Sequence, residues 1–297
     1  MGFFKTLFGG SEPDPKEKEE ADKAKFFDNL KYSGVSSLHE GQYEEAIKCF
    51  NKALEIKNDL EIHDYLSQAY IRNDEQETAL EQLQILAESQ PDNKQILIHM
   101  ANVTYMLENY DKMLAICEKA ETLDNDDAQI RYLHAQAFIG QGNVINAIAQ
   151  LTKAITLKDD YADAYLLRGE TLLKMGDVNG AGEDADWLMK HTKDVEDVLL
   201  LEARIKHAKG DLKESISYYN KVIEVNPFCV VAFKERGSVK LENGDKEGAE
   251  EDARQILEIN PNEAEKVSGN YEAKGSEGGI QQKVEDAYKV NNPFGLG

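Results

Sequence analysis

Apolar positions recur along the chain with the period of a helix, in segments that are separated by short turns at a fixed spacing. Four turns begin with a glycine and follow one another every 34 residues, and a fifth glycine turn stands nearer the start: Gly142, Gly176, Gly210, Gly244 and Gly41. The segments DEQETAL from 74 and ENYDKML from 108 fill the remaining gaps, with an acidic residue in place of the glycine. A helix-length segment precedes each turn and an amphipathic one follows it. The pattern predicts seven consecutive helix-turn-helix units.

Two positions in every unit carry mostly small side chains. We call the units repeats 1 to 7 and number the positions of each from 1 to 34. Position 8, in the first helix, is Gly34, Ser67, Ala101, Ala135, Gly169, Ala203 and Gly237. Position 20, in the second helix, is Ala46, Ala79, Met113, Ala147, Ala181, Ser215 and Ala249. Small side chains at both positions let the two helices of a repeat approach closely.

Proline stands at position 32 of repeats 2, 6 and 7, where a residue without an N–H ends the second helix: Pro91, Pro227 and Pro261. With this period and these residues, residues 27–263 resemble the tetratricopeptide repeat family. The resemblance implies an all-α fold, a right-handed superhelical solenoid whose first helices line a concave, protein-binding groove. Two departures stand out. The usual tryptophan at position 4 is missing, and Met113 is expected to loosen packing in repeat 3.

The repeats leave short flanks. We expect residues 1–25 to be an apolar start with a flexible, charged linker. Residues 26–268 are expected to hold the seven repeats and a short capping helix, and residues 269–297 a glycine-containing tail with room for one short helix. Repeats 5 and 7 share the pattern GDxxGAxEDA, from Gly176 and from Gly244, which predicts similar local packing.

Composition narrows the classes of partner. The chain has 297 residues, of which 41% are hydrophobic and 30% charged, and its net charge is -22. This charge disfavours nucleic acid, whose phosphates need basic patches, and favours protein segments that are basic or apolar. Three cysteines lie far apart (Cys49, Cys117 and Cys229), which suggests neither disulfides nor a thiolate zinc site. No apolar run approaches the ~20 residues of a membrane span. We therefore expect a cytoplasmic protein.

Nothing in the sequence indicates catalysis or a cofactor. No nucleophile elbow, phosphate-binding loop or dinucleotide-binding glycine pattern occurs. His99 and His134 fall on neighbouring first helices, yet neither has a second ligand at the i+4 position, so we interpret them as surface or packing residues. The chain is expected to be no enzyme and to hold no metal.

The predicted groove is the most informative surface. Positions 5, 9 and 12 of the first helices share one helix face. Position 9 is polar from repeat 2 onward, whereas positions 5 and 12 are mostly apolar, so hydrogen-bonding groups run between two apolar rows. Such a surface suits a peptide segment. The alternative is that these residues are only the family's habitual ones. The candidates are Gln68, Ile71, Ile98, Asn102, Tyr105, Tyr132, Gln136, Ile139, Leu166, Glu170, Leu173, Leu200, Arg204, His207 and Ser238.

Some members of the family hold the C-terminal carboxylate of heat-shock chaperones in a clamp of lysine, asparagine and arginine. From repeat 1, the corresponding positions here are Lys31, Val35, Tyr65, Gln95 and His99. When the clamp is counted from repeats 3, 4 or 5, its last positions have no cation and contain acidic residues instead: Asp163, Asp197 and Glu235. A carboxylate bound there would lack its cations, so we expect no clamp of this kind.

Two functional hypotheses remain. The first is an adaptor or scaffold whose groove holds a segment of another protein. The second is a membrane-peripheral regulatory or assembly subunit, recruited through the apolar residues of Met1–Phe8. A segment this short binds membranes weakly without a second signal, which favours the first hypothesis.

Overall fold

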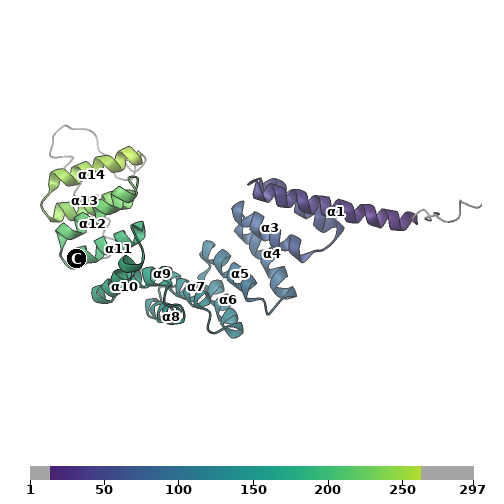
Figure 1. The fold of residues 1–297 in the computed structure, drawn as a ribbon, viewed down its shortest axis with the longest axis horizontal. Helices are drawn as coiled ribbons and strands as arrows, with labels where there is room; N and C mark the ends of the chain where they lie inside the picture. The colour runs from purple at the N-terminus through teal and green to yellow at the C-terminus, as the bar shows by residue number, and fades with distance from the viewer. Residues whose placement is uncertain (1–13, 262–297) are drawn as a thin grey trace, which may run out of the picture. The chain divides into compact units, whose positions relative to one another are not determined.

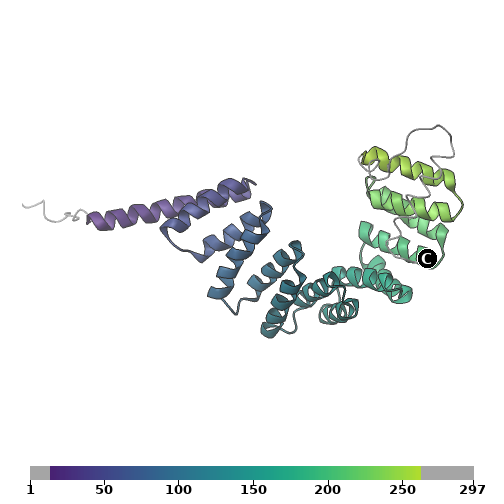
Figure 2. The ribbon, with the colours of Figure 1, turned by 180° about the vertical axis from the view of Figure 1, so that it is seen from behind.

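The computed structural model describes residues 14–261 (Figures 1 and 2). In this part of the chain there are only α helices, fourteen in a row: α1 (Pro15–His39), α2 (Tyr43–Ile56), α3 (Leu60–Arg72), α4 (Gln76–Ser89), α5 (Lys94–Met106), α6 (Tyr110–Leu123), α7 (Ala128–Gly140), α8 (Val144–Leu157), α9 (Ala162–Lys174), α10 (Val178–His191), α11 (Glu196–Ala208), α12 (Leu212–Val225), α13 (Val230–Glu242) and α14 (Lys246–Ile259). Odd-numbered helices are the first helices of the repeats, and even-numbered ones the second. The predicted all-α solenoid of tandem helix hairpins is confirmed.

The chain divides into two compact units. Unit 1 comprises Met1–Gly142 and contains α1 to α7, and unit 2 comprises Asn143–Gly297 and contains α8 to α14. Within each unit every helix packs on the next. First helices also contact one another directly, as α5 does α7 and α9 does α11, whereas successive second helices have no contact of that extent. The first helices therefore line the inner face of each unit. We use "inner face" for the surface formed by their positions 5, 9 and 12.

Helix α1 begins earlier than the sequence analysis expects. Residues 15–25, expected as part of a flexible linker, form its first three turns. The Asp14 side chain caps the helix by accepting a hydrogen bond from the backbone N–H of Lys16 at 3.1 Å, and Pro15 occupies the first turn, where its missing N–H costs nothing. Lys23 pairs with Glu19 one turn away, at 2.8 Å. Capping and good helix-forming residues thus outweigh the charge of this segment.

The turns between paired helices require a left-handed backbone. The five turn glycines have φ between 73° and 88°. Asp74 and Glu108, which replace glycine in repeats 2 and 3, adopt the same conformation with φ of 62° and 53°. A side chain in this region clashes with its own backbone, although aspartate tolerates it better than glutamate.

We therefore expect Glu108→Gly to raise the free energy of unfolding by about 1 kcal/mol, the strain a non-glycine residue bears there. Urea titration followed by circular dichroism measures this change. The reverse substitution, Gly142→Glu, serves as the matched control and should lower stability. A destabilised Glu108→Gly protein would show that the Glu108 side chain makes a favourable contact that outweighs the strain.

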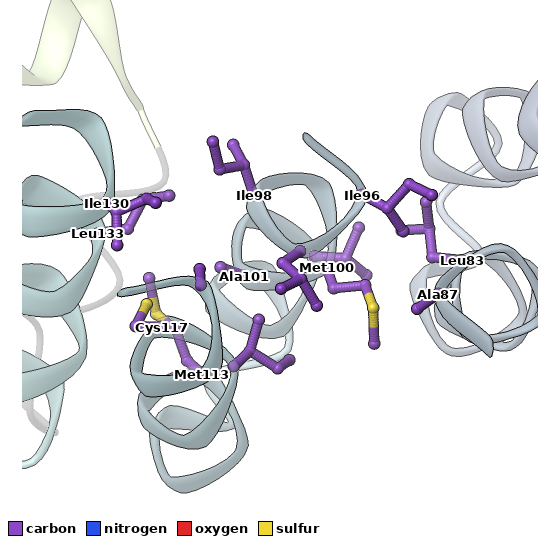
Figure 3. Close-up of a cluster of buried hydrophobic side chains, with 14 of the residues drawn as sticks. Leu83, Ala87, Ile96, Ile98, Met100, Ala101, Met113, Cys117, Ile130 and Leu133 are labelled. Atoms are coloured by element: carbon purple, nitrogen blue, oxygen red, sulfur yellow. The ribbon is translucent and has the colours of Figure 1, made fainter. Parts of the chain in front are cut away.

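Close helix packing explains the small residues. A Cβ atom at Gly34 would lie 2.5 Å from the Phe50 ring, which is fully buried between α1 and α2. Met113 is also fully buried, in a cluster built from α4, α5, α6 and α7 that includes Leu83 and Ile130 (Figure 3). The flexible methionine side chain fills its space, so the expected loosening has no counterpart in the packing.

Each proline at position 32 follows the end of a second helix, as predicted: α4, α12 and α14 end two residues before Pro91, Pro227 and Pro261. None of the helices within residues 14–261 is long and apolar enough to cross a membrane. The apolar start Met1–Phe8, the capping helix expected after Pro261 and the tail from residue 269 lie outside the described residues.

Candidate functional site

The inner face of unit 1 carries a row of amide side chains at position 9. Gln68, Asn102 and Gln136 stand on α3, α5 and α7, and each is half-buried. The Gln68 amide nitrogen donates to an Asp64 carboxylate oxygen at 2.9 Å. By contrast, no residue between 14 and 261 forms a hydrogen bond with the side-chain amides of Asn102 and Gln136. Both amides can therefore donate to and accept from a ligand.

Apolar side chains flank these amides. Tyr105 on α5 is 44% exposed, and its ring meets that of Tyr110 edge-on with the centroids 6.3 Å apart. Ile71, Tyr132 and Ile139 are half-buried on α3 and α7. The apolar row at position 12 is thus present on unit 1 as partly exposed surface, whereas position 5 contributes only Tyr132.

Three of the predicted apolar candidates lie in the core instead. Ile98, Leu173 and Leu200 are only 2%, 4% and 7% exposed. Each belongs to a hydrophobic cluster of its unit, because closely packed first helices enclose side chains at positions 5 and 12. These residues support the inner face but cannot line a pocket on it, which corrects the prediction.

The inner face of unit 2 is charged and internally paired. Arg204, at position 9 of α11, donates from Nε and Nη2 to the two carboxylate oxygens of Glu235 on α13, both at 2.9 Å. Its Nη1 lies 3.7 Å from Glu170 Oε1 on α9. The hydroxyl of the buried Tyr219 also donates to Glu235, at 3.0 Å. Burial raises the pKa of Glu170 above its usual range, and the nearby Arg204 opposes that shift.

The other candidates of unit 2 are less enclosed. His207 Nε2 lies 2.7 Å from a carboxylate oxygen of Glu242. Leu166 and Ser238 are half-buried. Much of this face is thus occupied by contacts within the chain, whereas the amides of Asn102 and Gln136 on unit 1 are not.

Two of the clamp positions form ion pairs within the chain, and the two histidines differ in burial. Lys31 forms an ion pair with Glu61, and Glu235 is held by Arg204. His99 is exposed on α5. His134 is buried, with its ring stacked on Phe138 at a centroid distance of 4.7 Å.

An arginine–aspartate pair recurs in repeats 5 and 7, where the shared GDxxGAxEDA pattern predicted similar packing. Arg168 Nε donates to Asp184 at 2.9 Å, and Arg236 Nε donates to Asp252 at 3.0 Å. A second guanidinium nitrogen binds the other carboxylate oxygen in each pair. Both aspartates are buried, at 2% and 0% exposure. These pairs were not predicted from the sequence, although the arginine that precedes position 8 in both repeats was a signal.

Comparisons with known proteins agree with this architecture. Models of the family described as tetratricopeptide repeat match residues 28–60, 132–186 and 196–229. The chain is 28% identical over 149 residues to DnaJ homolog subfamily C member 3 of Homo sapiens and equally to that of Mus musculus. The matched part is 42% of this chain and 30% of either relative, so the chain spans less than a third of their length.

Solved structures show the same fold at low sequence identity. A tetratricopeptide repeat protein from Parabacteroides merdae superposes with a TM-score of 0.69 at 14% identity, over 89% of this chain and 99% of that protein. PilW, a type IV pilus biogenesis factor, superposes with a TM-score of 0.62 at 19% identity, over 68% of this chain and 94% of PilW. Seven helix hairpins within residues 14–261 and three segments that match the family models lead to one conclusion: this part of the chain is built of tetratricopeptide repeats.

Proposed function

We propose that this protein-interaction scaffold has no catalytic activity of its own and holds an extended segment of a partner protein on the inner face of unit 1. The observation that carries the proposal is the pair of half-buried amides, Asn102 and Gln136, with no hydrogen-bonding partner within residues 14–261. Both amides are free of hydrogen bonds within the described part of the chain, so a bound backbone can form hydrogen bonds with them without breaking any that the fold needs.

The geometry of the face suits an extended chain. Helices α5 and α7 contact each other directly, and packed helices lie about 8–10 Å apart. An extended segment covers that distance in about three residues, at about 3.3 Å each. A carboxamide from each helix can then bind the backbone at every third residue, while Tyr105, Ile139 and Ile71 contact the side chains between these points.

Charge favours the same class of partner. The position-9 residues of repeats 2 to 4 are neutral amides, and the chain as a whole carries a net charge of -22. A segment with apolar side chains for the tyrosine and isoleucine surface, and with lysine or arginine nearby, matches both features.

The test is comparative capture from a cell extract with quantitative mass spectrometry. Wild-type protein is compared with the Asn102→Ala/Gln136→Ala double variant and with Ser238→Ala, a matched position-9 control on unit 2. We expect the principal partner to be depleted only with the double variant. Equal capture by all three proteins would overturn the proposal.

A further inference from the structure

Repeats 5 and 7 each contain a built site for a guanidinium group, filled by the chain's own arginine. The arginine stands at position 7 and binds the aspartate at position 23 of its own repeat. Its Nη1 then donates to position 25 of the preceding repeat: Arg168 to Thr152 Oγ1 at 3.1 Å, and Arg236 to Asn220 Oδ1 at 2.6 Å. Position 7, position 23 and the preceding position 25 therefore meet at one place.

Repeat 6 lies between these two repeats and has the opposite charge at this place. Position 7 is Glu202 on α11, the preceding position 25 is Asp186 on α10, and position 23 is Tyr218 on α12. In repeats 5 and 7 these three positions hold a guanidinium and its hydrogen-bond acceptors. In repeat 6 they hold two carboxylates and a phenol. Repeat 6 therefore lacks the position-7 arginine that fills this place in repeats 5 and 7.

The Glu202 side chain is unusual in its surroundings. Glu202 is only 6% exposed, yet no residue within 14–261 donates a hydrogen bond to its carboxylate. Among the described residues, His134 Nε2 is the one side-chain N or O that is fully buried and has no hydrogen-bond partner. The Glu202 oxygens have no partner in this part of the chain either, so they are not fully buried and are in contact with solvent. The carboxylate therefore lies at the end of a buried side chain and opens to the surface.

The cations near this place are already engaged or stand at its edge. Lys206 Nζ pairs with Glu214 at 3.0 Å, and the Lys221 ammonium lies over the Tyr218 ring, 4.3 Å from its centroid. Lys209 is exposed. Burial raises the pKa of Glu202, with Lys206 and Lys209 opposing the shift and Asp186 and Glu214 adding to it.

We propose that Glu202, Asp186 and Tyr218 form a docking site for an arginine side chain of a partner protein. The planar guanidinium carries five N–H donors, and it matches the acceptors that Glu202, Asp186 and the Tyr218 hydroxyl present. Position 7 is about 200° around the helix from position 9, so this site faces away from Arg204 on the inner face. It is independent of the segment-binding surface of unit 1.

Trp187 provides a signal for this site. It follows Asp186 directly and is the only tryptophan of the chain. Its ring stacks between Tyr165 and His191, with centroid distances of 3.9 Å and 4.2 Å. A guanidinium that binds Asp186 changes the electrostatic field at this indole, and the emission of Trp187 reports it.

The experiment titrates the full chain with N-acetyl-arginine amide and follows Trp187 emission. N-acetyl-citrulline amide, which has nearly the same shape and no charge, is the control ligand. We expect a saturable change with the arginine compound alone. Glu202→Gln and Asp186→Asn should each weaken binding at least tenfold, whereas Glu224→Gln, which removes an exposed charge elsewhere on α12, should leave it unchanged.

Glutamine keeps the size of the Glu202 side chain, and circular dichroism checks that each variant is folded. The Asn102→Ala/Gln136→Ala protein should bind the arginine compound normally, so failure of the unit 1 proposal and failure of this one are distinguishable. An equal response to citrulline, or wild-type binding by the folded Glu202→Gln protein, would overturn the site. So would a wild-type chain that shows no saturable response.

Discussion

Alanine at Arg168 is expected to lower the free energy of unfolding by about 3–5 kcal/mol, the usual effect of removing one partner from a buried ion pair. The guanidinium of Arg168 satisfies both carboxylate oxygens of Asp184, which is only 2% exposed. Without it, a negative charge remains buried with no cation. Urea titration followed by Trp187 emission measures the loss, because Trp187 lies on the same helix as Asp184.

The size of this loss should depend on pH. Burial already raises the pKa of Asp184 above its usual value, and Arg168 opposes the shift. Removing Arg168 raises the pKa further, so the folded variant binds a proton more readily than the unfolded chain does. The stability deficit of the variant relative to wild type therefore shrinks as pH falls from 7 through the pKa of Asp184 in the folded variant. The deficit has disappeared below the pKa of an aspartate in the unfolded chain, about 3.9.

Two controls accompany this prediction. Arg168→Lys retains the charge but not the two parallel hydrogen bonds, so it should cost less than alanine. Arg236→Ala tests the pair with Asp252 and should cost less than Arg168→Ala, because Lys240 Nζ remains 3.0 Å from a carboxylate oxygen of Asp252. A stability deficit of Arg168→Ala that stays constant between pH 7 and pH 4 would contradict the electrostatic explanation and point to lost packing.

The second large effect concerns binding. Replacing Asn102 and Gln136 together by alanine should weaken partner binding by about 5- to 150-fold, because each lost hydrogen bond contributes ~0.5–1.5 kcal/mol. Isothermal titration calorimetry with the captured partner segment measures the change. Helical content should stay the same, since neither amide contributes a hydrogen bond within the described part of the protein. Wild-type affinity in the double variant would place the binding surface elsewhere.

The periodic features of the fold were predictable because each repeat meets the same physical requirement. A turn that needs a left-handed backbone selects glycine, as at Gly142, and a close helix crossing selects a small residue, as at Gly34. These requirements are local, so one sequence reveals them. The first turns of α1 differ from the prediction because their abundant charge is typical of a linker, whereas the cap at Asp14 stabilises a helix.

The candidate site was only partly predictable, because burial depends on neighbouring helices. Asn102 and Leu173 both follow from the repeat register, yet one is half-buried with its amide unpaired and the other is enclosed in the core. The helical period predicts on which face of its helix a residue lies, but not how closely the next helix packs against it. The pair of Arg168 and Asp184 joins positions 16 residues apart, and only the packed hairpin shows that they meet.

The exposed first turns of α1 have a consequence for the sensitivity of the protein to proteases. All side chains of residues 15–25 are exposed, so these turns are held by their own hydrogen bonds and by ion pairs such as Lys23–Glu19. A helical stretch this short opens often, because little free energy opposes its unwinding. Trypsin should therefore cleave first after the lysines of this stretch. It should stop before Phe27, whose buried ring anchors the helix to the repeats.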